Sequence, residues 1–249
     1  MKKTIQLVFI LLFLNQITIN LNAQNIANSD VYTLKLIKEI PLLSIGIGGG
    51  LYGQYLHRQK PVLDAVDIQS LNANAIKPAF DRFATRNNSY RSKVWSDVLL
   101  YSVMAAPFSL LLDKNIRNDY KNVGVIGLET YLLNAAVTGI TKEIFQRKRP
   151  YVYNSTFTLA EKMERDATSS FFSGHTSMVA ASYFMTAKMY SDYHPNSKAL
   201  PFVWAGAATI PALTALFRVK AGKHFLTDVL VGYIVGAGIG LLVPELHRN

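Results

Sequence analysis

Three short clusters hold the side chains of this sequence that could do chemistry. The first contains Lys142, Arg149 and Pro150. Residues seven positions apart fall on nearly the same face of a helix, so Lys142 and Arg149 can point at one target. Pro150 moves the residue before it out of helical conformation. Two cations facing one point predict an anion site, although basic side chains that reach for a membrane surface would give the same pattern.

The second cluster contains Ser173, Gly174 and His175, directly before an apolar stretch. Small residues at a helix N-terminus expose backbone N–H groups where the helix dipole is positive, and this suits a bound phosphate. His175 would then lie beside the anion. Taken alone, the cluster could equally be a serine helix cap with an incidental histidine.

The third cluster contains Arg218, His224 and Asp228. If a helix begins near His224, Asp228 lies one turn further along the same face and can accept a hydrogen bond from one ring nitrogen. The other nitrogen is then unprotonated, as a nucleophile requires. A helix-capping histidine beside a carboxylate is the plainer interpretation, and the third cation at the same place, Arg218, argues against it.

Helices have to position these clusters. Apolar stretches recur along the chain, and they predict an all-α, membrane-embedded bundle of about six helices. An up-and-down bundle would bring the clusters to one side, because the third and fifth helices end there and the fourth and sixth begin there. The expected helices cover about residues 40–56, 96–112, 122–141, 175–190, 199–217 and 225–244.

Glycines mark the first and the last of these stretches. Pro41 and five glycines within residues 46–53 make the first stretch a poor helix unless its neighbours support it. In the last stretch Gly232, Gly236 and Gly240 recur every four residues, so they lie on one helix face. We expect this bare face to let another helix approach closely.

The composition favours a membrane protein. Of 249 residues, 50% are hydrophobic and 17% are charged, whereas soluble domains have roughly 25% charged residues. The net charge of +10 favours an anionic lipid surface or an anionic substrate. The sequence has no nucleic-acid-binding motif, so nucleic acid is not an expected partner. It has no cysteine, which excludes disulfides, thiolate metal sites and cysteine nucleophiles.

The N-terminus has the layout of a secretory signal peptide over residues 1–23. Two lysines precede an apolar run over residues 5–14, and cleavage is expected after Ala23. An uncleaved membrane anchor is the alternative. Residues 24–94 are expected to hold the first apolar helix and a polar amphipathic segment, and residues 95–249 the catalytic helical bundle.

In this order, the three clusters resemble the signature of the type 2 phosphatidic acid phosphatase (PAP2) superfamily. That superfamily also includes bacterial acid phosphatases and vanadium-dependent haloperoxidases. The resemblance covers roughly residues 95–245 and implies a phosphoric ester hydrolase. Phe172 stands where the family normally has proline, and Phe217 where it normally has serine. We therefore expect a phosphate pocket with fewer hydrogen bonds than usual.

The resemblance also implies which residues bind phosphate. The cations Lys142, Arg149 and Arg218 would hold the phosphoryl oxygens, offsetting the charge that metal ions offset in other phosphotransferases. Backbone groups at Ser173 and Gly174 would complete the cradle. No metal and no cofactor is expected, because the sequence has no histidine or carboxylate cluster with ligand spacing.

The two histidines of the signature would share the catalytic work. By the resemblance, His224, oriented by Asp228, would attack phosphorus and form a phosphohistidine. His175 would protonate the leaving alcohol and afterwards activate water.

The expected activity is hydrolysis of lipid phosphates or isoprenoid pyrophosphates in a bacterial inner membrane, with membrane lipids as partners. The active site is expected to face the periplasm, whereas a membrane-spanning stretch over residues 40–56 would place it on the cytoplasmic side. A secreted acid phosphatase for small phosphomonoesters is the alternative. A vanadium-dependent haloperoxidase would use a similar anion pocket, but the modest length and membrane character argue against it. A catalytically inactive scaffold is disfavoured, because every expected ligand, acid and nucleophile is present.

The remaining polar residues receive plainer interpretations. His57, His194 and His247 lie in polar stretches and are expected to be solvated. Glu129, inside an apolar stretch, is expected to be hydrogen-bonded within the bundle rather than to support the site. Residues 151–170 link the first two clusters and could cover the pocket as a substrate-selecting lid.

Overall fold

The computed structural model describes residues 31–249, so the expected signal peptide lies outside the described residues. Within this part the regular elements are helices, apart from an isolated β-bridge between Tyr32 and Arg248. The predicted all-α bundle of six helices is confirmed. The long helices are α2 (Leu36–Gln59), α4 (Tyr90–Leu110), α6 (Tyr120–Phe145), α8 (Gly174–Tyr193), α9 (Leu200–Lys220) and α10 (Leu226–His247).

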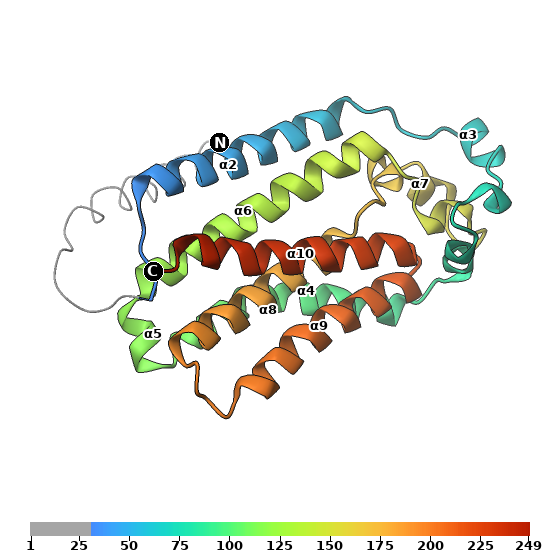
Figure 1. Cartoon of the computed structure of the whole chain (residues 1–249). Helices are drawn as coiled ribbons and strands as arrows, with labels where there is room; N and C mark the ends of the chain where they lie inside the picture. The colour runs from blue at the N-terminus through green and yellow to red at the C-terminus, as the bar shows by residue number, and fades with distance from the viewer. Residues whose placement is uncertain (1–30) are drawn as a thin grey trace.

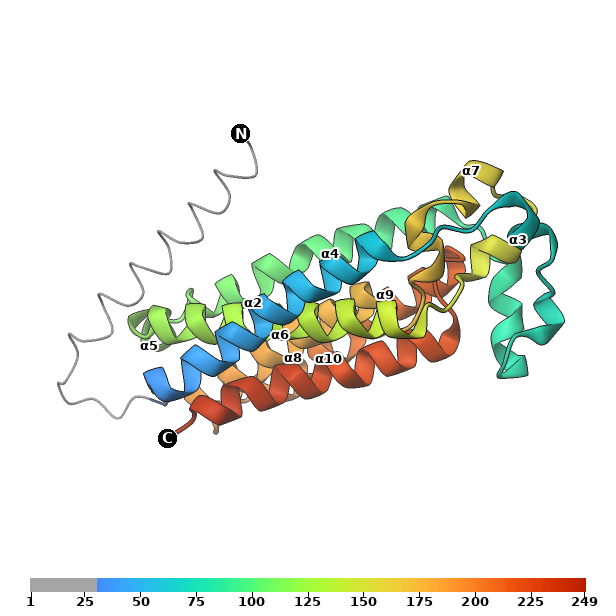
Figure 2. The same ribbon diagram turned by 90° about the horizontal axis from the view of Figure 1, so that it is seen from above.

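Successive long helices run in opposite directions (Figure 1). As predicted, α6 and α9 end at the same end of the bundle at which α8 and α10 begin. We call this the catalytic end, because all three sequence clusters lie there. The short elements that cover it are α3 (Ala65–Gln69), η1 (Ala73–Ala75), η2 (Ala79–Arg86), η3 (Pro150–Tyr153), α7 (Leu159–Lys162) and η4 (Arg165–Thr168), whereas α5 (Lys114–Asn118) lies at the opposite end (Figures 1 and 2).

The glycine face of α10 packs against α8, as predicted. A Cβ atom at Gly232 would lie 2.7 Å from the backbone carbonyl oxygen of Ser173, the N-cap of α8, and one at Gly236 or Gly240 would lie 2.1 or 2.4 Å from a carbonyl oxygen within α8. Real Cβ atoms do not come so close to another atom, so only glycine allows this spacing between the two backbones. The contact fixes the first turn of α8 against the first turns of α10, and both turns carry site residues.

The first helix also depends on its neighbour. Although Pro41 lies inside it, α2 is continuous over 24 residues. Gly46, Gly49 and Gly53 face α6, where a Cβ at Gly53 would lie 3.1 Å from the backbone of Gly139. The poor intrinsic helix propensity of this stretch is therefore offset by close packing along α6.

Among residues 31–249, three segments are long and apolar enough to cross a membrane: Tyr120–Tyr153, Leu200–Lys220 and Leu226–His247. Large apolar side chains also project outward from the bundle, for example Phe202 on α9 and Ile234 on α10, which are 78% and 69% exposed. In water such a surface would be costly, whereas lipid tails would cover it. The chain is a membrane protein, as the composition predicts.

One of the histidines expected to be solvated is fully buried instead. His247 lies near the end of α10 opposite the catalytic end, with its Nε2 3.0 Å from Glu129 and 3.2 Å from Glu39. None of the three side chains is more than 4% exposed. Sequence analysis missed this cluster because its members come from three helices whose rotation is not evident from the sequence. His57 and His194 are partly exposed and pair with Glu143 and Asp113.

Candidate active site

His224 lies in the turn between α9 and α10 and is 1% exposed. The chain reverses direction at Gly222, which has a φ of 66°. Glycine adopts this left-handed conformation without steric strain, because it has no Cβ atom. The Nδ1 atom of His224 lies 2.9 Å from the backbone carbonyl oxygen of Ser170. A carbonyl oxygen can only accept, so Nδ1 carries the proton and Nε2 has a free lone pair. His224 therefore has the tautomer that a nucleophile requires.

Asp228 supports His224 in a different way from the predicted one. Its Oδ2 atom is 3.6 Å from the Nδ1 of His224, which is too long for a hydrogen bond. Instead, Oδ2 accepts hydrogen bonds from the Ser170 hydroxyl at 2.5 Å and from the Phe225 N–H at 2.9 Å. Asp228 thus fixes the segment that presents the Ser170 carbonyl, and the direct hydrogen bond predicted between Asp228 and His224 is absent.

The surroundings of His224 keep its ring neutral. Burial disfavours the charged imidazolium, and the positive charges of Arg149, Arg218 and Lys142 disfavour it further, so the pKa of His224 lies well below its usual value. The three predicted phosphate-binding cations therefore lie close enough for their charges to act on the same histidine. A neutral imidazole among cations can attack an anionic phosphoryl group.

Lys142 and Arg149 meet at the site, but not because they share a helix face. Helix α6 ends at Phe145, and Gln146 adopts a left-handed conformation with φ of 43°. Arg149 has extended backbone angles just before η3. The prediction that both residues lie on one helical face is therefore wrong, and the tight turn after α6 brings Arg149 back to the site instead.

Two of the cations have donors that are not used. The Nε atom of Arg218 is buried and has no hydrogen-bond partner among residues 31–249. In the same part of the chain no hydrogen-bond acceptor or carboxylate is paired with the Nζ atom of Lys142, which lies 3.6 Å from the position that a Cβ atom of residue 174 would occupy. An unpaired buried donor is costly unless a ligand satisfies it, so the Nε atom of Arg218 indicates an anion site, to which the free ammonium of Lys142 would contribute.

The N-terminus of α8 contributes fewer backbone donors than predicted. The Ser173 N–H already donates to the backbone carbonyl of Asp228 at 3.0 Å, and its hydroxyl accepts from the Thr176 N–H as the helix cap. The predicted backbone contact from Ser173 to phosphate is therefore not available, because this donor ties α8 to α10. The N–H of Gly174 has no acceptor within the described residues and stays the candidate donor.

His175 pairs with a residue that sequence analysis missed. Its Nε2 atom lies 3.0 Å from Oδ1 of Asp97 on α4, and the same oxygen lies 3.6 Å from Nη1 of Arg218. Asp97 thus connects the candidate acid to one of the phosphate-binding cations. A single acidic residue within an otherwise apolar stretch was the available signal for it.

Asp166 is the second missed residue. It lies on η4, within the stretch predicted to cover the pocket, and its Oδ2 is 2.6 Å from Nη2 of Arg149. Burial opposes its charge, but Arg149 and Lys142 outweigh burial, and the pKa of Asp166 is lowered. An ionised carboxylate therefore neutralises Arg149.

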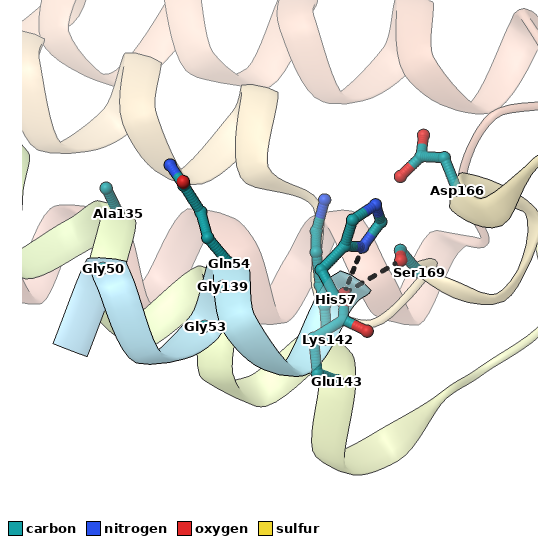
Figure 3. A pocket seen from close by; sticks show the side chains of 10 residues that line it. All are labelled: Gly50, Gly53, Gln54, His57, Ala135, Gly139, Lys142, Glu143, Asp166 and Ser169. Atoms are coloured by element: carbon teal, nitrogen blue, oxygen red, sulfur yellow. Dashed lines mark hydrogen bonds and ion pairs between the residues drawn. The ribbon is translucent and has the colours of Figure 1, made fainter. Parts of the chain in front are cut away.

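A cavity of about 280 Å³ opens beside these residues (Figure 3). Its polar end holds Lys142, Asp166 and His57, and it continues between α2 and α6 past small residues. Those small residues are Gly50 and Gly53 on α2 and Ala135 and Gly139 on α6. Because they have almost no side chains, they leave open the part of the cavity that leads away from Lys142 between the two helices.

Within residues 31–249 no group of three or more histidine, aspartate or glutamate side chains is arranged to hold a metal ion. The expectation that no metal takes part stays a prediction. The arrangement itself offers a neutral histidine, three cations and a second histidine paired with a carboxylate. These groups can bind a phosphoryl group and transfer it.

The chain is similar to known proteins in both sequence and structure. The family model described as PAP2 superfamily matches residues 124–249. Phospholipid phosphatase 1 of Rattus norvegicus is 31% identical over 98 residues, which are 37% of this chain and 34% of that protein. The chain thus spans about a third of the length of this relative.

A solved structure is also similar. It is the crystal structure of a transmembrane PAP2-type phosphatidylglycerolphosphate phosphatase from Bacillus subtilis, with 21% sequence identity and a TM-score of 0.48. The match covers 82% of this chain and 96% of that one.

Proposed function

Because the chain belongs to the PAP2 superfamily, we propose that it is a metal-independent phosphatase that hydrolyses lipid phosphates or isoprenoid pyrophosphates through a phosphohistidine at His224. One observation carries this proposal. His224 is buried with its Nδ1 on a carbonyl oxygen, and the charges of Lys142, Arg149 and Arg218 act on it. This is the environment of a neutral nucleophile that faces a phosphoryl group.

In the first step the phosphoryl oxygens replace Asp166 on Arg149 and take up the free donors of Lys142, Arg218 and Gly174. Nε2 of His224 then attacks phosphorus while the bond to the leaving oxygen breaks. His175 donates a proton to that oxygen, so that an alcohol leaves, or a phosphate monoester if the substrate is a pyrophosphate. The cations stabilise the charge on the three equatorial oxygens of the transition state.

In the second step water hydrolyses the phosphohistidine. His175 has lost its proton and now takes one from the water, whose oxygen attacks phosphorus as the bond to Nε2 breaks. Inorganic phosphate leaves, and His224 returns to the neutral form with its proton on Nδ1. Asp97 accepts a hydrogen bond from His175 and would stabilise the protonated ring before the first step and again after the second.

The cavity between α2 and α6 supports a lipid substrate. It starts at Lys142 and continues past glycines and an alanine of two long helices, one of which lies in a candidate membrane span. A phosphate bound at Lys142 could therefore extend its apolar chain into this cavity. A small phosphomonoester would have no use for such a channel.

A secreted acid phosphatase remains the alternative function. Extraction of the protein from membranes distinguishes it from a membrane-embedded lipid phosphatase. We expect washed membranes to release the protein with detergent and not with high salt, since outward apolar side chains hold it in lipid. Release by salt alone would favour the soluble enzyme.

We further propose that the catalytic end faces the periplasm of a bacterial cell membrane, as is common among the bacterial proteins that the sequence resembles. The chain has no cysteine, so one cysteine placed near Tyr151 reports its side of the membrane. Labelling by an impermeant maleimide in intact spheroplasts supports the proposal. Labelling only after lysis would show a cytoplasmic site, which is what an exported N-terminus followed by a spanning α2 would produce.

The activity is tested by phosphate release from purified protein in detergent with a chelator present. The panel should contain phosphatidate, phosphatidylglycerol phosphate, lipid A phosphate, undecaprenyl pyrophosphate and a small phosphomonoester. His224→Ala should abolish release, whereas His194→Ala should retain it, because His194 pairs with Asp113 at the opposite end of the bundle. Release by His224→Ala at the wild-type rate would refute the mechanism.

A further inference from the structure

Arg147 lies between two buried carboxylates at the catalytic end. Its Nη1 donates to Oδ1 of Asp228 at 2.5 Å, and its Nη2 donates to Oδ2 of Asp81 at 2.8 Å. Both aspartate side chains are 0% exposed, and that of Arg147 is 20% exposed. A single guanidinium therefore compensates two carboxylates that are removed from water.

The other contacts of Arg147 leave it no terminal donor for a substrate. Its Nη1 also donates to the Thr227 hydroxyl at 2.7 Å, and its Nη2 faces the backbone carbonyl of Lys77 at 3.4 Å. The centre of its guanidinium lies 4.2 Å from the centre of the Phe225 ring. Arg218, by contrast, has a buried Nε without a partner in the described part of the chain. Arg147 is thus occupied by the protein, whereas Arg218 is available to an anion.

Asp81 connects a different part of the chain to the same turn. It lies on η2, and its carboxylate accepts from the Thr227 N–H at 3.1 Å and from the Thr227 hydroxyl. Thr227 directly precedes Asp228 in the first turn of α10. The segment that covers the catalytic end is therefore bonded to the turn that carries Asp228.

We propose that Arg147 and Asp81 are positioning residues that hold Asp228, and through Asp228 the Ser170 carbonyl and His224, in the reactive arrangement. This inference rests on the proposed function. Asp228 can keep two strong hydrogen-bond acceptors aimed at Ser170 and Phe225 only while its charge is compensated. Arg147 supplies the positive charge that compensates Asp228, and Asp81 holds the other terminal nitrogen of the Arg147 guanidinium.

A role as a fourth phosphate-binding cation is the competing explanation for Arg147. A phosphate-binding role and a positioning role for Arg147 predict different kinetic effects of its substitution. Loss of a phosphate ligand weakens the binding of vanadate, which takes the place of phosphate, and raises KM. Loss of a positioning residue lowers kcat and leaves vanadate binding nearly unchanged, because Lys142, Arg149 and Arg218 still bind the anion.

The experiment measures kcat and the inhibition constant of vanadate for purified full-length variants. For Arg147→Gln we expect kcat to fall by roughly 10-fold to 100-fold, as for a misplaced catalytic group, and vanadate inhibition to change by less than about threefold. Arg147→Lys should recover only part of kcat, because an ammonium cannot bridge both carboxylates. Asp81→Asn should also lower kcat, as Arg147→Gln does. The control is Lys148→Gln, since no residue of 31–249 forms an ion pair or hydrogen bond with the Lys148 side chain.

A double variant decides between positioning and general loss of structure. In the Asp228→Asn background, Arg147→Gln should lower kcat by less than about threefold further, because the residue that it positions is already changed. Full additivity of the two effects, or a vanadate inhibition constant that rises in proportion to the loss in kcat, would overturn the inference. Asp81→Asn is nearly isosteric and provides the second test if Arg147→Gln does not fold. If His224→Ala were as active as the wild type, the proposed function would fail and not this inference alone.

Discussion

The carboxylate of Asp228 lies 3.6 Å from the Nδ1 atom of His224 and makes no hydrogen bond to it. The backbone carbonyl of Ser170 takes that place at 2.9 Å. In a catalytic triad the carboxylate fixes the tautomer of the histidine, and its replacement by an amide inverts that tautomer. Here a carbonyl oxygen, which no side-chain substitution alters, fixes it.

Asp228→Asn should therefore be a mild variant. The oxygen of an asparagine can still accept from Ser170 and Phe225, so the Ser170 carbonyl keeps the proton on Nδ1 of His224, while the ion pair with Arg147 and the negative charge near the ring are lost. We expect kcat to fall by no more than about 100-fold, compared with about 10⁴-fold for the equivalent change in a triad. His224→Ala, measured in parallel by phosphate release, should lose at least about 1,000-fold. Equal losses for the two variants would mean that Asp228 fixes the tautomer after all.

Asp97→Asn should lower kcat/KM by an amount that depends on the leaving group of the substrate. Asp97 lies 3.0 Å from His175 and would stabilise the protonated ring that donates to the leaving oxygen. For an alkyl phosphate we expect kcat/KM to fall by about 10-fold to 100-fold, within the range of general acid catalysis. For p-nitrophenyl phosphate, whose phenolate leaves without a proton, the loss should stay below about threefold.

The ratio kcat/KM is the suitable measure for this comparison, because it reports the steps up to departure of the leaving group and excludes hydrolysis of the intermediate. His175→Ala serves as the reference and should show the same dependence on the leaving group. A uniform loss for both substrates would instead assign Asp97 to phosphate binding through Arg218.

Gly50→Phe should reduce activity on long-chain lipid phosphates. A Cβ at Gly50 meets no atom within 4 Å, and Gly50 lines the cavity that begins at Lys142, so a phenyl ring can fill this channel without distorting the backbone. We expect kcat/KM to fall by about tenfold for a long-chain substrate and to change by less than about twofold for p-nitrophenyl phosphate.

Gly48→Phe is the matched control, because Gly48 also has open space around its Cβ position and does not line the cavity. Gly48→Phe should leave kcat/KM unchanged for both the long-chain substrate and p-nitrophenyl phosphate. If Gly50→Phe reduced activity on both substrates to the same extent, the cavity would not be the path of the apolar chain.

Gly236→Leu should destabilise the bundle. Even its Cβ would lie 2.1 Å from the Ser177 carbonyl oxygen, so α8 and α10 would have to separate. Overpacking of this kind costs about 1–3 kcal/mol or more, and thermal unfolding in detergent should shift to lower temperature. Gly238→Ala on the same helix meets no atom within 4 Å and should raise stability by up to about 1 kcal/mol. An unchanged unfolding temperature for Gly236→Leu would show that this helix contact is not tight.

The helices and the main site residues could be predicted from the sequence, because they depend on local patterns. Apolar stretches of spanning length indicate where helices lie, and the ends of these stretches carry Lys142, His175 and His224. The spacing of Gly232, Gly236 and Gly240 even indicated which face of α10 is packed closely. The up-and-down order then places the clusters together.

The partners of these residues could not be predicted, because they depend on how the helices are rotated and where loops return. Asp97 lies 78 residues from His175, and Asp81 lies 66 residues from Arg147. The left-handed turn at Gln146 moves Arg149 off the helix, although the spacing from Lys142 fits one helical face. The Ser170 carbonyl belongs to the backbone, so no residue type in the sequence marks it.

The central claim, a phosphoryl group carried by His224, is tested most directly by trapping the intermediate. His175→Ala should react with p-nitrophenyl [³²P]phosphate, which needs no acid, and should then hydrolyse the phosphohistidine slowly because the base is missing. After an alkaline quench we predict close to one labelled phosphate per chain, mapped to His224 by peptide mass spectrometry and absent when His224→Ala is added. Label on another residue, or label that persists in the double variant, would contradict the account.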